Sequence, residues 1–113
     1  MTYTEKLVDL VIHFRERPIP SEVIDRAKIF IMDNIGCAIG GYATEAGKQI
    51  VMQAKEFKGA DEATIIGDGS VVSAPFACWA NSSLANVLDM DDVFAGTAHQ
   101  GNCLVPTALG MGQ

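Results

Sequence analysis

The chain of 113 residues has the length of one small domain, and its 49% of hydrophobic residues is enough for one packed core. Its formal net charge of −6 disfavours nucleic-acid binding, which depends on clustered Lys and Arg, but leaves an anionic substrate open. The apolar runs are too short to span a bilayer, and the start of the chain does not resemble a signal peptide. Cys37, Cys78 and Cys103 form no Cys-x-x-Cys pair, so we expect reduced thiols in a soluble cytoplasmic protein.

The apolar spacing predicts two helices in the first part of the chain. The first is capped by Thr4 and runs to about Arg15, where Pro18-Ile19-Pro20 breaks the pattern. Ser21 is the expected N-cap of the second helix, which keeps its spacing until Gly40-Gly41 ends it.

The end of the second helix and two further elements follow in chain order. Residues 29–32 are apolar all round, so we expect the second helix to be buried on several sides there. A third helix is predicted from about Glu45 to Phe57, ended by Gly59. β-Branched residues on both sides of a glycine-rich turn then predict a short β-hairpin over residues 63–72.

The last part of the chain is predicted to contain two more helices. Ser73 and Pro75 open a helix that reaches about Leu88, and residues 89–102 show no periodicity. Val105-Pro106 opens a final helix that has no capping signal at its end and is apolar or small almost throughout. Such a segment needs neighbours to cover it, so we expect a fragment, or a subunit that a partner completes.

The segment between these two helices contains the candidate chemistry. Asp89, Asp91 and Asp92 are close enough to repel one another, which favours a proton on one of them. Histidine side chains can exchange a proton near neutral pH, and Gly96 permits a tight return of the loop that would bring His99 toward the aspartates. An acid–base site is therefore one interpretation. The alternative is that the aspartates cap a helix or face solvent and that the histidine is a surface residue.

Two sequence patterns resemble the MmgE/PrpD family. One is Asn-x-x-x-Ala-x-x-Leu-Asp-x-Asp-Asp over residues 81–92, followed by His-x-Gly and Val-Pro-x-Ala-Leu. The other is the apolar segment at residues 27–41, which ends in Gly-Cys-Ala-Ile-Gly-Gly. The hairpin followed by Val-Ser-Ala-Pro at residues 72–75 is similar as well. The resemblance extends along the whole chain in the family's segment order.

The resemblance implies a mainly α fold, in which residues 1–113 are the N-terminal portion of a helical domain. The rest of that domain and a separate α/β domain would lie outside this chain. Members of the family include 2-methylcitrate dehydratase, cis-aconitate decarboxylase and iminodisuccinate epimerase. The family is usually homodimeric, needs no metal or organic cofactor, and has its active site between the two domains.

By the same resemblance, Asp89 and His99 fall on active-site positions, and Asp91 and Asp92 are expected to orient them or to bind substrate. The implied function is a lyase-type acid–base reaction, dehydration or decarboxylation, on small di- or tricarboxylates such as 2-methylcitrate or cis-aconitate. The implied partners are the substrate and a second copy or a complementing downstream polypeptide, with no nucleic acid or membrane. The chain alone is expected to be inactive, because the family's lysines and second histidine lie downstream.

Three positions depart from the family pattern. Asn86 stands where the family often has His, Val93 where it has Thr, and Gln100 where it has Pro. Valine donates no hydrogen bond, so one substrate contact is missing or moved. These departures bear on the substrate more than on the family.

Other functions are weighed against this one. The chain could be a non-catalytic truncated or split subunit that provides a helical interface. The segment Asp89-Met-Asp-Asp92 could bind Mg²⁺ through its oxygens. The same four residues match a proton-donor motif of some terpene cyclases, which is a short match.

Overall fold

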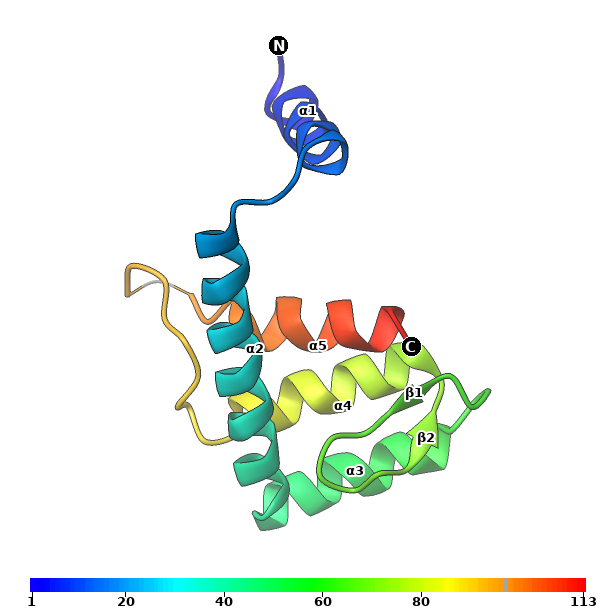
Figure 1. The fold of residues 1–113 in the computed structure, drawn as a ribbon. Helices are drawn as coiled ribbons and strands as arrows, with labels where there is room; N and C mark the ends of the chain where they lie inside the picture. The colour runs from blue at the N-terminus through cyan, green and yellow to red at the C-terminus, as the bar shows by residue number, and fades with distance from the viewer. Residues whose placement is uncertain (97) are drawn as a thin grey trace.

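The computed structural model describes residues 1–96 and 98–113, and its helices and hairpin are arranged as in Figure 1. The elements within these residues are α1 Tyr3–Glu16, α2 Ser21–Tyr42, α3 Glu45–Phe57, β1 Ala63–Thr64, β2 Val71–Val72, α4 Ala74–Asn86 and α5 Gly101–Met111. The predicted mainly helical architecture with one short hairpin is confirmed.

The helical layer is formed by α3, α4 and α5, and α2 crosses one end of it (Figure 1). Side chains from α2, α3, α4 and the hairpin make up the core, with Ile65, Val72 and Leu84 its largest apolar members. Most other core residues are alanines. Short side chains let the helices approach closely, so the core depends on close backbone packing rather than on bulky residues.

Helices α2 and α4 approach each other closely at a glycine, Gly41. Helix α2 continues through Gly40 and Gly41 to Tyr42, although we expected the two glycines to end it. A methyl group on Gly41 would lie 2.0 Å from the carbonyl oxygen of Leu84 on α4. Gly41 therefore serves helix packing rather than helix termination.

The first and last helices also begin or end differently from the prediction. Helix α1 is capped by Thr2, which forms a capping box with Glu5, so it starts before Thr4. Helix α5 begins at Gly101, and Pro106 lies inside it rather than at its start. The C-cap of α5 is Gly112, whose N–H donates to the carbonyl of Leu109, so the expectation of an uncapped end is wrong.

The hairpin is held against α4 by one buried amide. The Asn81 Oδ1 accepts from the Ile66 N–H at 2.8 Å, and the Asn81 Nδ2 donates to the Thr64 carbonyl at 2.9 Å. Gln113 accepts from the Thr64 N–H at 2.9 Å, which ties the end of the chain to the same strand. These bonds satisfy the strand groups that a two-residue ladder leaves unpaired.

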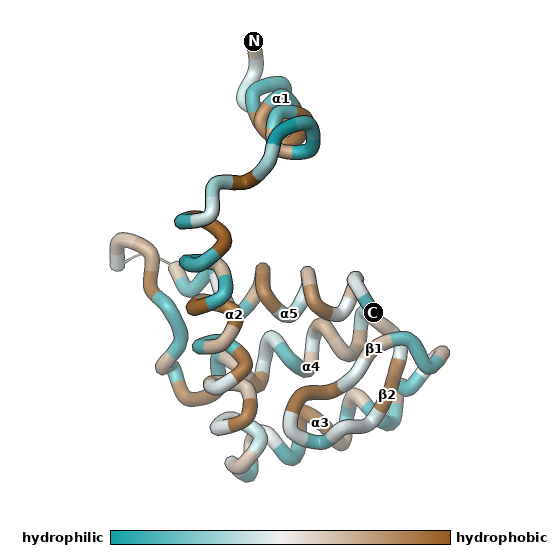
Figure 2. The backbone as a smooth tube through the Cα atoms, viewed as in Figure 1, coloured by the Kyte–Doolittle hydropathy of each residue, from teal (hydrophilic) through white to brown (hydrophobic). Residues whose placement is uncertain are grey.

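Helix α1 stands apart from the rest of the described structure. It contacts no other helix or strand in this part of the chain, and Pro18-Ile19-Pro20 connects it to α2. Its apolar side chains are exposed, and brown and teal segments alternate along it in Figure 2. Ile29, Phe30 and Met32 on α2 are also at least half exposed, so the expected burial on several sides is wrong here. Among the described helices, none has the length and apolar character that crossing a membrane requires.

Candidate active site

The loop from the end of α4 to the start of α5 brings three of the four predicted site residues together, Asp89, Asp91 and His99. The Asp89 N–H donates to the Asn86 carbonyl, and Asp89 has a left-handed backbone with φ of +52°. Ala95 and Gly96 also have positive φ, and the Phe94 N–H donates to the Ala98 carbonyl at 2.8 Å. This turn reverses the loop and returns His99 to the aspartates, along the path that Gly96 predicts.

His99 lies between two carboxylates of very different exposure. Its Nδ1 is 3.1 Å from Asp91 Oδ1, and the Asp91 side chain is 0% exposed. Its Nε2 is 3.4 Å from Asp89 Oδ1, and the Asp89 side chain is 81% exposed. The same Asp91 oxygen accepts from Asn86 Nδ2 at 3.3 Å. One carboxylate therefore faces the interior and the other faces solvent.

This arrangement has a direct chemical meaning for the imidazole. An ionised carboxylate only accepts hydrogen bonds, so with Asp91 ionised the Nδ1–H of His99 is the donor of this bond. In the neutral ring Nε2 then has a free lone pair on the side of Asp89. A base whose second nitrogen is oriented by a buried partner is a recurring arrangement for proton transfer.

Asp92 does not join this group. It lines an apolar groove of about 410 Å³ between α2 and α5, together with side chains such as Phe30 and Leu104. A methyl group on Gly101, the first residue of α5, would lie 1.9 Å from Asp92 Oδ1. A carboxylate at a helix N-terminus is favourable because the first N–H groups and the helix dipole are positive there. Asp92 is thus placed to stabilise the start of α5.

One face of α2 lies close to Asp91 and Asp92 and carries Cys37. Burial raises the pKa of the Cys37 thiol, and the negative charges of Asp33, Asp91 and Asp92 raise it further. The raised pKa keeps the thiol protonated, which makes it a poor nucleophile. One turn earlier on α2, Asn34 is 2% exposed. Residue patterns alone did not single out Asn34, because an Asn within a long apolar helix has no motif.

Two buried polar atoms in this region have no hydrogen-bond partner among the described residues. They are Nδ2 of Asn34 and Oδ2 of Asp91, a donor and an acceptor. Buried polar side-chain atoms are mostly paired in folded proteins, so such exceptions point to a strained or functional place.

The three predicted residues nearest one another could also hold a cation. Asp89, Asp91 and His99 each offer one ligand atom, and these three atoms lie within 4.8 Å of one another. A set with an imidazole suits Zn²⁺ or Mn²⁺ better than Mg²⁺, which prefers oxygen ligands. Asp92, which the Mg²⁺ alternative included, lies outside this group.

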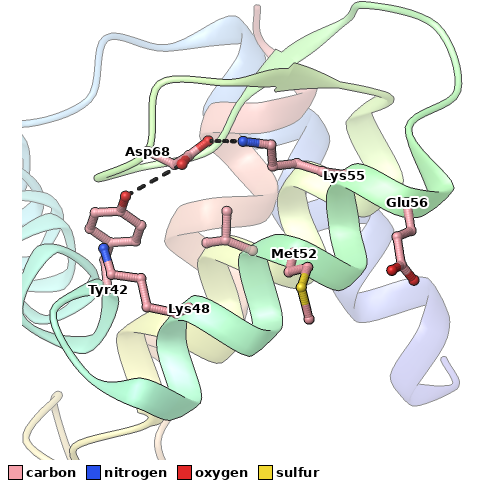
Figure 3. Close-up of a pocket in the computed structure, with 7 residues that line it drawn as sticks. Tyr42, Lys48, Met52, Lys55, Glu56 and Asp68 are labelled. Atoms are coloured by element: carbon pink, nitrogen blue, oxygen red, sulfur yellow. Dashed lines mark hydrogen bonds and ion pairs between the residues drawn. The ribbon is translucent and has the colours of Figure 1, made fainter.

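A second pocket, of about 370 Å³, lies between α3 and the hairpin turn, away from His99 (Figure 3). Both of its lysines have partners: Lys55 pairs with Asp68 at 3.2 Å, and Lys48 lies over the Tyr42 ring at 3.3 Å from its centroid. A hydrogen bond from Ser70, followed by the effects of Lys55, lowers the pKa of Asp68. Because these groups satisfy one another, we interpret the pocket as the place where the hairpin turn is fixed to α3.

The comparisons with known proteins agree with the sequence patterns. The family model of the MmgE/PrpD N-terminal domain matches residues 5–113. Cis-aconitate decarboxylase of Aspergillus terreus, and the protein of the same name from its strain NIH 2624 / FGSC A1156, are each 27% identical over 92 residues. The alignment covers 80% of this chain and 19% of each relative, so the chain spans about a fifth of their length. No solved structure matches.

Proposed function

The chain belongs to the MmgE/PrpD family, and from this membership we propose that it supplies an acid–base pair to a lyase acting on small di- or tricarboxylates. Asp89 and His99 transfer protons, and Asp91 orients the imidazole. The observation that supports this most is the position of His99 between a buried carboxylate on Nδ1 and an exposed one on Nε2. Cis-aconitate and 2-methylcitrate are the substrates that we would test first, for decarboxylation and dehydration respectively.

The proposed chemistry uses the free nitrogen of His99. Nε2 removes a proton next to a carboxylate, or returns one to the carbanion that decarboxylation leaves. Asp89, at 3.4 Å and open to solvent, passes the proton between Nε2 and water. Asp91 stabilises the imidazolium that forms in between, because it is buried and already bonded to Nδ1.

Substrate binding needs positive charge, and no Lys or Arg among the described residues forms an ion pair with Asp89 or Asp91. The ion pairs of Lys28, Lys55 and Lys58 in the described structure are with aspartates elsewhere, none with the site. A polycarboxylate near Asp89 and Asp91 would be repelled unless cations are added. We therefore propose that the 113 residues are one portion of the helical domain and are inactive alone. The remaining helical part and an α/β domain supply the cations.

The same proposal covers assembly and location. The apolar groove beside Asp92 and the exposed apolar side of α1 support a homo-oligomer or a complementing polypeptide as partner. Cys37, Cys78 and Cys103 are free thiols, which fits a cytoplasmic location.

Two other functions have a specific observation in their favour. The exposed apolar groove and α1 also fit a non-catalytic split or truncated subunit that provides only a helical interface. The close spacing of Asp89, Asp91 and His99 fits a divalent cation. Loss of activity on chelation and its return with Zn²⁺ or Mn²⁺ would favour the cation.

The test is an assay of the chain joined to, or mixed with, the polypeptide encoded downstream. We expect turnover of cis-aconitate or 2-methylcitrate only in the completed protein. His99→Ala and Asp89→Asn should each lower kcat/KM by on the order of 10²–10⁴-fold, the usual cost of losing a general acid or base. Circular dichroism checks that each variant is folded.

Asp61→Asn is the matched control, because Asp61 is an exposed aspartate that pairs with Lys58 at 3.8 Å, on the surface. It should leave the rate unchanged. Near-normal turnover in both site variants would refute the assignment of Asp89 and His99. Full activity of the 113 residues alone would refute the claim that they are only a portion of the enzyme.

A further inference from the structure

Asn86, the last residue of α4, contacts both carboxylates that flank His99. Its side-chain Nδ2 donates to Asp91 Oδ1 at 3.3 Å, and its backbone carbonyl accepts from the Asp89 N–H at 2.8 Å. The residue before it on α4, Ala85, is 0% exposed and belongs to the core. Asn86 therefore connects the loop of the candidate site to the packed interior.

Two acceptors compete for the ring proton of a neutral His99. With the proton on Nδ1 the ring donates to Asp91 Oδ1 at 3.1 Å, and with the proton on Nε2 it would donate to Asp89 Oδ1 at 3.4 Å. Only the first tautomer leaves Nε2 free to accept a proton. Whatever holds Asp91 Oδ1 in its place therefore helps to decide whether the ring can act as a base through Nε2.

The Asn86 amide and the His99 ring converge on the same oxygen of Asp91. Oδ1 receives both contacts, whereas the buried Oδ2 has no partner among the described residues. Turning the carboxylate out of this orientation would break the amide bond as well as the ring bond, so the amide resists the turn. Asn86 is itself exposed, so its side chain contributes little to packing. An amide does not titrate, so this donor is present at every pH.

We propose that Asn86 is a positioning residue of the candidate site, whose amide holds Asp91 Oδ1 toward His99 and so keeps the ring proton on Nδ1. Asn86 touches no reacting atom in this scheme. The inference rests on the proposed function for its purpose, but the tautomer can be measured without any catalysis. The backbone bond to Asp89 does not involve the side chain, so substitutions at this position test the amide alone.

The first experiment is ¹⁵N NMR of the His99 ring at an alkaline pH, where imidazole is neutral. One dominant tautomer gives two widely separated ring ¹⁵N resonances, and exchange between tautomers brings them together. We expect the wide separation of the Nδ1–H tautomer in the unaltered protein, and a smaller or reversed separation in Asn86→Ala. Asn86→Gln, which keeps an amide donor on a longer side chain, should restore part of it. Gln53→Ala removes an exposed amide from α3, where it lines a separate pocket, and should leave the separation unchanged.

Urea unfolding of the same variants separates positioning from packing. We expect Asn86→Ala to unfold at nearly the same urea concentration as the unaltered protein, because the side chain that it removes is exposed. An unchanged His99 signal in Asn86→Ala would overturn the proposal. A large loss of stability in this variant would also overturn it, since Asn86 would then serve the fold rather than the site.

An assay of the completed protein distinguishes this inference from the proposed function. Asn86→Ala should lower kcat by about tenfold or more and change KM little, because it disturbs the base rather than substrate binding. If His99→Ala has no effect on turnover, the proposed function fails whatever the NMR shows. If His99→Ala abolishes turnover and Asn86→Ala leaves kcat unchanged, the positioning role fails alone.

Discussion

His99 lies between two carboxylates that differ in burial, and the proposed mechanism gives each of them a different task. Asp91 is enclosed and shares its Oδ1 between His99 and Asn86, so it is placed to orient. Asp89 is exposed and faces the other ring nitrogen, so it is placed to exchange protons with water. The order in sequence does not reveal this division, because both residues belong to one Asp-x-Asp-Asp motif.

Replacing Asp91 by Asn should therefore be the most informative change at the site. The amide keeps the size of the side chain but can donate to Nδ1, which favours the tautomer with its proton on Nε2. We expect kcat of the completed enzyme to fall by on the order of 10²–10⁴-fold, with a folded protein. A ring ¹⁵N spectrum that still shows the Nδ1–H tautomer would contradict this explanation.

The proximity of Asp89 and His99 is predictable from the sequence, whereas the arrangement of the other candidate residues is not. Asp89 and His99 follow from motif spacing and from the turn at Gly96, which are local properties. The separation of Asp92 from the group, and the approach of Asn34, depend on how α2 packs across the loop. Such packing is set by contacts between residues that are far apart in sequence, and no local pattern encodes it.

At the scale of elements, alanine substitutions at two glycines of α2 should change the free energy of unfolding in opposite directions. Gly41→Ala would place a methyl group 2.0 Å from the Leu84 carbonyl oxygen, whereas a methyl group on Gly36 meets nothing within 4 Å. We expect Gly41→Ala to lower the free energy of unfolding by about 1–3 kcal/mol through overpacking. Gly36→Ala should raise it by about 0.5–1 kcal/mol, because alanine favours a helix interior. Urea unfolding followed by circular dichroism measures both, and changes of the same sign would refute the packing role of Gly41.

The contribution of Asp68 in the hairpin turn to stability should depend on pH. The pKa of Asp68 is lowered in the folded chain, first by Ser70 and then by Lys55. A lowered pKa means that its contribution to stability is fully present above the ordinary value of about 3.8 and is lost as the pH falls through the folded value. Asp68→Asn should cost about 1 kcal/mol at pH 7, because Lys55 is half exposed and the pair is screened.

The measurement is the free energy of unfolding of both proteins between pH 7 and pH 2. The difference between them should be constant down to about pH 4 and should shrink below it. Asp61→Asn, which alters an exposed pair with Lys58, should leave the curve almost unchanged. A difference that persists unchanged at pH 2 would contradict the role of the Asp68 charge.

Helix boundaries show where sequence reasoning is limited. Helix α3 has its predicted bounds, Glu45–Phe57, because a clear amphipathic run stops shortly before Gly59. The end of α2 and the start of α5 were not, because glycine and proline usually mark termini. In α2, tertiary contact with α4 outweighs the low helix propensity of Gly41.

At the scale of the whole molecule, many large apolar side chains of the described structure remain exposed outside its core. The groove between α2 and α5 and the free side of α1 are separate apolar surfaces. Isolated soluble domains rarely expose contiguous apolar patches of large size. We therefore expect association, with the groove as one contact.

Leu104→Lys tests this expectation, since Leu104 lines the groove and is 65% exposed. A buried charge at an interface should weaken association by tenfold or more, which corresponds to about 1.4 kcal/mol. Met52→Lys, on α3 and 52% exposed, is the control outside the groove. Sedimentation velocity over a range of concentrations measures both. A monomer at every concentration, with no binding of hydrophobic dye, would contradict the expectation.

The left-handed backbone at Asp89 restricts which residues evolution or engineering can place there. Asn, Asp and Gly tolerate positive φ, whereas longer and β-branched side chains pay a steric cost. A library randomised at this codon and selected for folding alone should return Gly, Asn and Asp, and selection for turnover should retain only Asp. Glutamate, although it preserves the charge, should be depleted in both selections because of this steric cost. Aspartate is thus the one acidic residue that satisfies the backbone and the chemistry together.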